Sequence, residues 1–182
     1  MQSIYAGGSM HVFLTGDRQI GKSRAVRRAA DALERPCYGF RTQFLTKERG
    51  TSSLYMVSPQ GEPTLDEAHM VAELRDGKMR PLTERFDSLG GALLREARQH
   101  PEGLILMDEC GHLEKNAQEF QKEILLCLDG DTPVLGVLRK DQPWHDFIKQ
   151  HPQVRVITVT EENRSEIDGV ILELLLQKKE EA

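Results

Sequence analysis

Residues 16–23, Gly-Asp-Arg-Gln-Ile-Gly-Lys-Ser, match the pattern G-x-x-x-x-G-K-[ST] at every fixed position. The apolar run 11–15 comes just before them, and the helix-favouring stretch 22–33 follows. Glycines let a backbone turn sharply around an anion, and a helix start offers free N–H groups and a positive dipole end. The order of these segments therefore predicts a strand, a phosphate-binding loop and a helix, the central unit of an α/β fold.

The loop as a whole is the candidate nucleotide-binding segment. Lys22 is expected to reach the β- and γ-phosphates, and Ser23 to offer its hydroxyl oxygen to Mg²⁺. The interior has no further glycine or proline, and Asp17 places a negative charge near the anion that Arg18 offsets. A chance match is the alternative, which the flanking segments disfavour. The candidate phosphate-binding residues are Gly16, Asp17, Arg18, Gln19, Ile20, Gly21, Lys22 and Ser23.

Two acids supply the second half of the predicted site. The apolar run 103–107 ends in Asp108 and Glu109, at the carboxyl end of a predicted buried strand, where α/β sheets bind ligands. Asp108 is expected to hold Mg²⁺, and Glu109 to orient the attacking water or accept its proton. The alternative is that both acids cap a solvated strand end, and the phosphate-binding loop favours the functional interpretation.

Other charged residues are open to two interpretations. Glu114 either faces the site or is an acid that favours the start of the next helix. Arg139 and Lys140 end another apolar strand, where they either meet phosphate oxygens or are solvated loop charges. Trp144 and Phe147, at helical spacing, are expected in the core rather than in a base-stacking platform. Three arginines are candidates for an arginine finger, with nothing to choose between them: Arg75, Arg80 and Arg85.

Strand and helix patterns alternate along the rest of the chain. Further strands are predicted at 37–44, 53–57, 133–138 and 154–159, and further helices at 86–100, 115–128, 144–150 and 163–179. The inward faces are expected to be Leu89, Leu93, Leu94 and Ala97, then Phe120, Ile124, Leu125 and Leu128, and finally Ile167, Val170, Ile171, Leu174 and Leu175. The expected fold is a three-layer α/β architecture with a mostly parallel central sheet.

Antiparallel hairpins of residues 37–86 are expected to decorate that sheet. One hairpin turns at 47–50. A second turns at Asp76-Gly77, between 69–74 and 79–86, although the first of these pieces also suits a short helix.

Composition excludes several classes of protein. The net charge of −5 argues against a nucleic-acid binder, and no apolar run approaches the roughly 20 residues of a membrane span. Three cysteines without C-x-x-C spacing, and no signal peptide, indicate a cytoplasmic protein with reduced thiols. Residues 1–9 are an expected extension before Met10, and residues 10–182 are expected to form one domain.

The motifs together resemble the small nucleoside-triphosphatases of the thermophile and cancer-related type. Gly39-Phe40-Arg41-Thr42 is similar to that family's G-F-x-T strand, and residues 108–114 to its D-E-I-G-x-M-E box. Residues 133–136 and 159–164 resemble its later strand and its T-x-E-N-R segment. Gln43-Phe44 departs from the family, which has an acidic pair there, and residues 64–86 match poorly.

The resemblance implies a P-loop domain that hydrolyses ATP, GTP and other nucleoside triphosphates slowly, with Mg²⁺ and little base selectivity. It implies that Lys22 and Glu109 are catalytic, that Ser23 and Asp108 serve the metal, and that Asn163 and Arg164 lie near the base or ribose. Two alternatives stay open. One is a kinase for a nucleoside or small metabolite, and the other is a nucleotide-dependent switch that binds a protein partner through residues 37–86.

Overall fold

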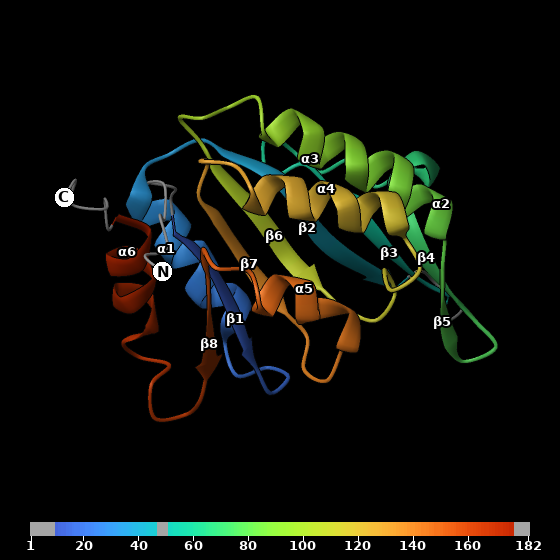
Figure 1. Ribbon diagram of the computed structural model, residues 1–182. Helices are drawn as coiled ribbons and strands as arrows, with labels where there is room; N and C mark the ends of the chain where they lie inside the picture. The colour runs from blue at the N-terminus through green and yellow to red at the C-terminus, as the bar shows by residue number, and fades with distance from the viewer. Residues whose placement is uncertain (1–9, 47–50, 177–182) are drawn as a thin grey trace.

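A single twisted sheet organises the part of the chain that the computed structural model describes, residues 10–46 and 51–176 (Figure 1). Its eight strands lie in the order β5-β4-β3-β2-β6-β7-β1-β8. The predicted α/β class and mostly parallel sheet are confirmed. The strands are β1 (His11–Gly16), β2 (Cys37–Thr46), β3 (Ser52–Val57), β4 (Met70–Arg75), β5 (Lys78–Pro81), β6 (Leu104–Cys110), β7 (Val134–Leu138) and β8 (Val154–Val159).

The sheet has a parallel and an antiparallel part. Strands β2, β6, β7, β1 and β8 pair in parallel, with Gly136 of β7 opposite both Phe13 of β1 and Met107 of β6. Strands β3, β4 and β5 continue the sheet from β2 in antiparallel pairs. The parallel strands are rich in valine, leucine and isoleucine because helices cover both of their faces.

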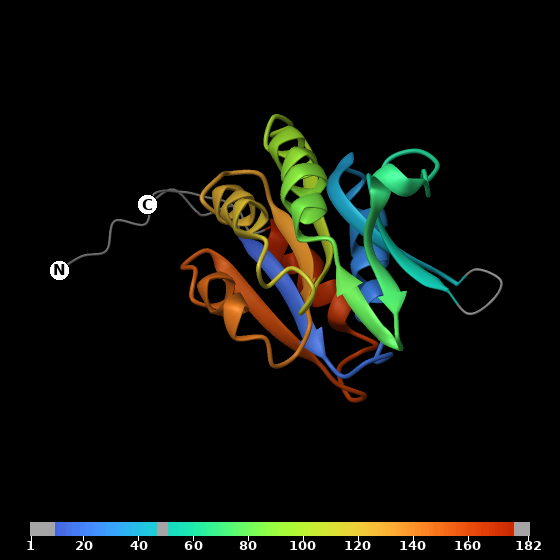
Figure 2. The same ribbon diagram turned by 90° about the vertical axis from the view of Figure 1, so that its right-hand side faces the viewer.

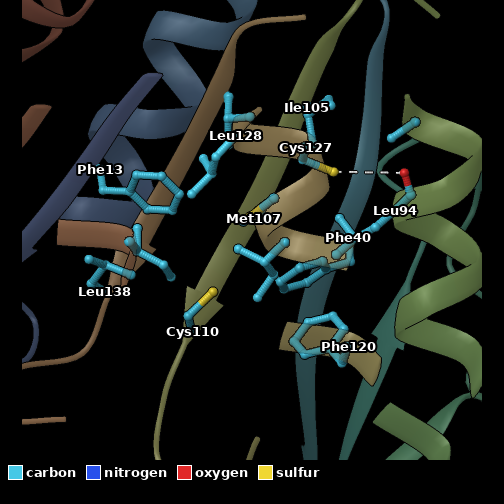
Figure 3. Close-up of a cluster of buried hydrophobic side chains, with 14 of the residues drawn as sticks. Phe13, Phe40, Leu94, Ile105, Met107, Cys110, Phe120, Cys127, Leu128 and Leu138 are labelled. Carbon is cyan, nitrogen blue, oxygen red and sulfur yellow. Dashed lines mark hydrogen bonds between the residues drawn. The ribbon is translucent and has the colours of Figure 1, made fainter. Parts of the chain in front are cut away.

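Two helix layers enclose the parallel strands (Figures 1 and 2). Helices α1 (Lys22–Leu33) and α6 (Ile167–Leu176) pack on one face, with a core that includes Val12, Leu14 and Ile171. Helices α3 (Gly91–Ala97), α4 (Gln118–Leu128) and α5 (Asp146–Lys149) cover the other face. Figure 3 shows the core beneath them, where Phe40 and Phe120 lie against Met107 and Cys127 Sγ contacts the Leu94 carbonyl.

The predicted hairpins are largely correct. The turn at Asp76-Gly77 joins β4 to β5, so the first piece is the predicted strand, and its alternative as a short helix is wrong. A short 3₁₀ turn, η1 (Glu67–His69), ends just before β4 begins. Strand β5 ends at Pro81, however, so the predicted strand over 79–86 is wrong beyond that residue. The predicted turn at 47–50 lies outside the described residues, although β2 and β3 on either side of it do pair.

The helices predicted over 86–100 and 163–179 have different boundaries in the structure. The helix predicted over 86–100 begins earlier, with α2 (Thr83–Arg85), and passes through a π-turn, η2 (Phe86–Gly90), before α3 ends at Ala97. At the π-turn, Gly90 lies against the Phe120 ring, where a Cβ would come within 2.7 Å. Helix α6 begins at Ile167 rather than Asn163, and the predicted residues 177–179 lie outside the described part.

The helices predicted over 115–128 and 144–150 are shorter than expected. The first begins only at Gln118, and η3 (Pro143–His145) precedes α5 as a separate 3₁₀ turn. Two predicted core residues, Leu125 and Val170, are 38% and 41% exposed. Each lies about 100° around its helix from a neighbour, Ile124 or Ile171, that is fully buried. None of the helices in residues 10–46 and 51–176 combines the length and the apolar composition that a membrane span requires.

Candidate active site

The phosphate-binding loop has the predicted strand and helix on either side of it. β1 ends at Gly16 and α1 begins at Lys22. Gly16 and Gly21 have φ values of 139° and 109°, which L-residues rarely adopt, and a Cβ on Gly16 would meet the Val159 carbonyl at 2.6 Å. The sequence pattern therefore reflects a real backbone requirement. No side chain caps the start of α1, and no acid lies in its first turn, which suits an anion.

Lys22 lies along the loop that carries it. Its Nζ donates to the carbonyls of Gly16, at 2.9 Å, and Asp17, at 2.6 Å. Desolvation lowers the pKa of Lys22, and the Glu109 and Asp17 carboxylates oppose that shift. The ammonium is therefore partly removed from water and lies within the field of Glu109, as a group that stabilises phosphate charge requires.

A cavity of about 1060 Å³ opens in front of the loop. All eight predicted loop residues line it, together with Glu109, Arg139, Lys140 and Arg164. Its position at the carboxyl end of the parallel strands is where ligands bind in α/β sheets. The lining residues are Gly16, Asp17, Arg18, Gln19, Ile20, Gly21, Lys22, Ser23, Arg24, Arg28, Glu109, Arg139, Lys140, Asp141, Arg164, Ser165 and Asp168.

The two acids at the end of β6 have different surroundings. Glu109 lines the cavity, whereas Asp108 is not among the lining residues. The Asp108 carboxylate accepts hydrogen bonds from the Thr42 backbone N–H, at 3.1 Å, and hydroxyl, at 3.4 Å. Burial raises the pKa of Asp108, and these bonds and the charges of Arg41 and Arg27 oppose the rise. The structure thus brings Glu109, but not the Asp108 side chain, into the cavity with Lys22.

Glu114 is buried, with 3% of its surface exposed. Its Oε2 accepts a hydrogen bond from the Gly111 N–H at 3.0 Å, which closes the turn that follows β6. Burial raises the pKa of Glu114 to about 7, and the nearby charge of Glu109 adds to the rise. It precedes α4, which starts at Gln118, so its contact is with the turn beside Glu109 and not with a helix end.

Only one of the two residues predicted to lie near the base or ribose lines the cavity. Arg164 lines the cavity, whereas Asn163 does not. The Asn163 side chain accepts from the Thr160 N–H at 2.8 Å and donates to the Thr158 carbonyl at 2.9 Å. Asn163 therefore shapes the loop that carries Arg164, and its bonds to that loop explain why α6 starts later than predicted.

The remaining candidate residues lie either against the core or away from the cavity. Trp144 and Phe147 pack against the core, as predicted, and the Trp144 indole N–H donates to the Gly111 carbonyl at 2.8 Å. The three arginine-finger candidates, Arg75, Arg80 and Arg85, do not line the cavity. Arg75 pairs with Glu73, and Arg85 donates to the Ala68 carbonyl.

Five lining residues were not predicted from the sequence. Arg24 and Arg28 are four residues apart on α1, a spacing that places both on one helix face and was readable from the sequence. Arg28 pairs with Asp168 of α6 at 3.1 Å, a contact between distant segments that no local pattern reveals. The missed residues are Arg24, Arg28, Asp141, Ser165 and Asp168.

The donor set suits magnesium. Ser23 offers a hydroxyl and Glu109 a carboxylate inside the cavity, while Asp108 lies beside it at the end of β6. Among residues 10–46 and 51–176, no group of three or more His, Cys, Asp or Glu side chains could hold a metal by itself. Mg²⁺ prefers one or two protein oxygens and completes its shell with water and phosphate oxygens. These residues therefore fit Mg²⁺ bound together with a nucleotide.

Known proteins are similar to this chain in sequence. A nucleoside-triphosphatase named THEP1 from Methanosarcina barkeri (strain Fusaro / DSM 804) is 28% identical over an alignment of 169 residues, and the match covers 89% of this chain and 95% of the relative. Another THEP1, from Natranaerobius thermophilus (strain ATCC BAA-1301 / DSM 18059 / JW/NM-WN-LF), is 24% identical over an alignment of 161 residues, and the match covers 86% of this chain and 91% of that protein.

Two solved structures share the fold. The crystal structure of THEP1 from the hyperthermophile Aquifex aeolicus has a TM-score of 0.71 at 22% identity, and covers 92% of this chain and 100% of that one. The solution structure of a human cancer-related nucleoside triphosphatase has a TM-score of 0.70 at 22% identity, with 94% and 100% covered. The model of the family described as NTPase matches residues 11–172. The chain therefore belongs to the NTPase family, as its motifs predicted.

Proposed function

We propose that this protein hydrolyses nucleoside triphosphates to the diphosphate and phosphate. The observation that carries the proposal is one cavity that joins the glycine-bounded loop, the Lys22 ammonium and the Glu109 carboxylate. Hydrolysis needs an anion cradle, a cation for the transferring phosphoryl group and a group that handles the water proton. Membership of the NTPase family supports the same reaction.

In the proposed reaction, a water oxygen forms a bond to the γ-phosphorus while the bond from that phosphorus to the bridging oxygen breaks. The electron pair of the broken bond leaves on the nucleoside diphosphate. The water proton passes to the Glu109 carboxylate and then to solvent, so the products are diphosphate, phosphate and one proton. Lys22 and the loop N–H groups stabilise the charge of the phosphoryl group, which supplies most of the catalysis expected of such sites.

We infer that Mg²⁺ is the cofactor. Bound with the nucleotide, it would neutralise charge on the β- and γ-phosphates. Ser23 would hold it through its hydroxyl oxygen, and Asp108 through a water, because the Asp108 side chain lies beside the cavity rather than in it. Thr42 keeps the Asp108 carboxylate oriented at the strand end.

The lining favours broad nucleotide use and slow turnover. No aromatic ring is among the described residues that line the cavity, so no stacking platform selects a base. The lining also includes Arg24, Arg28, Arg164 and Ser165, which suit phosphate and ribose oxygens more than one base edge. The three candidate finger arginines lie elsewhere, and enzymes that lack such a residue turn over slowly.

The test is steady-state phosphate release from ATP, GTP, CTP and UTP, with Mg²⁺ and with EDTA. We expect Mg²⁺-dependent release from all four nucleotides at rates within about tenfold of one another, because the site has no base-specific contact. Glucose or a nucleoside, added as a phosphate acceptor, should not raise the rate. Absence of release from every nucleotide, with Mg²⁺ present, would reject the proposal.

A further inference from the structure

Lys140 connects two separate parts of the site. It follows β7, which ends at Leu138, and its Nζ lies 2.6 Å from Asp17 Oδ1 in the phosphate-binding loop. Neither the catalytic scheme above nor the loop motif uses this lysine. It is nevertheless among the residues that line the cavity.

Two lysines therefore converge on one loop residue. Lys22 donates to the Asp17 carbonyl and Lys140 to the Asp17 carboxylate, both at 2.6 Å. The charge of Lys140 acts on Lys22, whose pKa it helps to lower. Glu109 also acts on Lys22, and all three side chains line the cavity, so Lys140 lies near the lysine that is expected to reach the γ-phosphate. Arg28 and Asp168, by contrast, form a pair between α1 and α6.

The backbone on either side holds Lys140 in this place. The Arg139 N–H donates to the Cys110 carbonyl at 2.9 Å, which ties the end of β7 to the residue after Glu109. Asp141 adopts a φ of 58°, so the chain turns sharply just after Lys140. The Arg139 guanidinium lies 3.2 Å from His112 Nδ1, so Lys140 rather than Arg139 reaches the loop.

The pair of Lys140 with Asp17 is easily exchanged for a stronger partner. The side chains are 45% and 79% exposed, and surface ion pairs of this kind contribute little stability. A γ-phosphate carries more negative charge than one carboxylate, and it would arrive in the partly desolvated cavity that already holds Lys22. The lysine would thus change partner at little cost when a triphosphate binds.

We propose that Lys140 is the chain's own γ-phosphate cation, which leaves Asp17 to contact the terminal phosphate and stabilises it during transfer. This inference rests on the proposed hydrolysis. It assigns to Lys140 the role for which Arg75, Arg80 and Arg85 were candidates. A diphosphate does not reach this position, so Lys140 also distinguishes triphosphates from diphosphates.

The test compares Lys140→Ala and Lys140→Arg with the wild type. The affinities for ADP and for a non-hydrolysable ATP analogue are measured by calorimetry with Mg²⁺, and phosphate release from ATP is measured in parallel. For Lys140→Ala we expect the preference for the triphosphate analogue to fall about tenfold or more, as the loss of one charge-assisted hydrogen bond would give. ADP affinity should stay within about twofold, and turnover should fall by at least the same factor as the preference. Lys140→Arg should retain most of the preference.

Lys149→Ala is the matched control. Lys149 also pairs with an aspartate, Asp146 on α5, and it does not line the cavity. This variant should keep the wild-type preference and turnover, and a thermal unfolding scan should show all three variants folded. An unchanged triphosphate preference in Lys140→Ala overturns the inference. If the wild type binds nucleotides but releases no phosphate, the proposed hydrolysis fails while the binding comparison still decides the role of Lys140.

Discussion

The parallel and antiparallel parts of the sheet differ in whether the residues at their strand ends line the cavity. Residues at the carboxyl ends of β1, β6 and β7 meet in one charged cavity. None of the residues of β3, β4 or β5 lines that cavity, although the same sheet continues through them. Parallel strands all end at one edge, so their loops converge, whereas antiparallel strands send successive loops to opposite edges. Strand direction, more than sheet membership, decides which charges can act together.

The largest expected contrast is between lysines of the two parts. Lys22→Ala should lower phosphate release about 10³-fold or more, because it removes the main cation that faces the transferring group. Lys78→Ala, an exposed lysine of β5, should leave the rate unchanged. Phosphate release measured side by side checks both. Equal rates in the wild type and Lys22→Ala would show that the loop does not serve catalysis.

A glycine-to-alanine substitution should destabilise the protein more in the parallel part than in the antiparallel part. Gly39 of β2 has a φ of 91°, and a Cβ there would overlap the Leu106 carbonyl of β6. Gly39→Ala should therefore destabilise the protein by about 3 kcal/mol or more, because rigid backbone cannot give way. Gly77 has a φ of 73° with open space around it, so Gly77→Ala should cost only about 1–2 kcal/mol. Denaturant unfolding measures both, and a reversed order would contradict the packing described for the parallel part.

The turn beside Glu109, the proposed catalytic base, should make the stability of the protein depend on pH. Burial raises the pKa of Glu114 to about 7 from an ordinary value of 4.5, so the folded protein binds a proton that the unfolded chain has lost. The contribution of Glu114 to the free energy of unfolding is therefore complete below its ordinary pKa of 4.5. It decreases as the pH rises from 4.5 to 7, by about 3 kcal/mol at most. Glu114→Gln, which still accepts from the Gly111 N–H, should remove this decrease. Urea unfolding of the wild type and of Glu114→Gln between pH 5 and 8 tests this prediction. The same dependence of unfolding free energy on pH in both proteins would disprove it.

The smallest expected effects lie in the antiparallel part. Arg75→Ala, Arg80→Ala and Arg85→Ala should each change phosphate release less than about twofold, because none of these side chains lines the cavity. Their contacts are with Glu73 for Arg75 and with backbone carbonyls for Arg85. A fall of tenfold or more in any of the three would show that this part moves onto the site during turnover.

Local patterns in the sequence were sufficient for the elements that build the site. The glycine-bounded loop placed β1 and α1 correctly, because the motif reflects backbone angles that few other residues adopt. The apolar run before Asp108 and Glu109 placed β6, since a strand buried on both faces leaves a continuous signal.

Features that depend on tertiary contacts were harder to predict. The π-turn before α3 accompanies the packing of Gly90 on Phe120, thirty residues along the chain, and the pattern of α3 alone does not contain it. The different surroundings of Asp108 and Glu109 depend on Thr42, and the pair of Lys140 with Asp17 joins segments far apart in sequence. Side-chain orientation and long-range pairing were therefore what the sequence left open.

The measurement that tests the central claim most directly compares the wild type with Glu109→Gln. Phosphate release from ATP with Mg²⁺ is followed together with ATP affinity under the same conditions. We predict that the substitution lowers turnover about 10²- to 10⁴-fold, because the amide cannot accept the water proton, while affinity stays within about threefold. Wild-type turnover in Glu109→Gln would contradict the proposed role of Glu109 as the catalytic base, and with it the reaction proposed for this cavity.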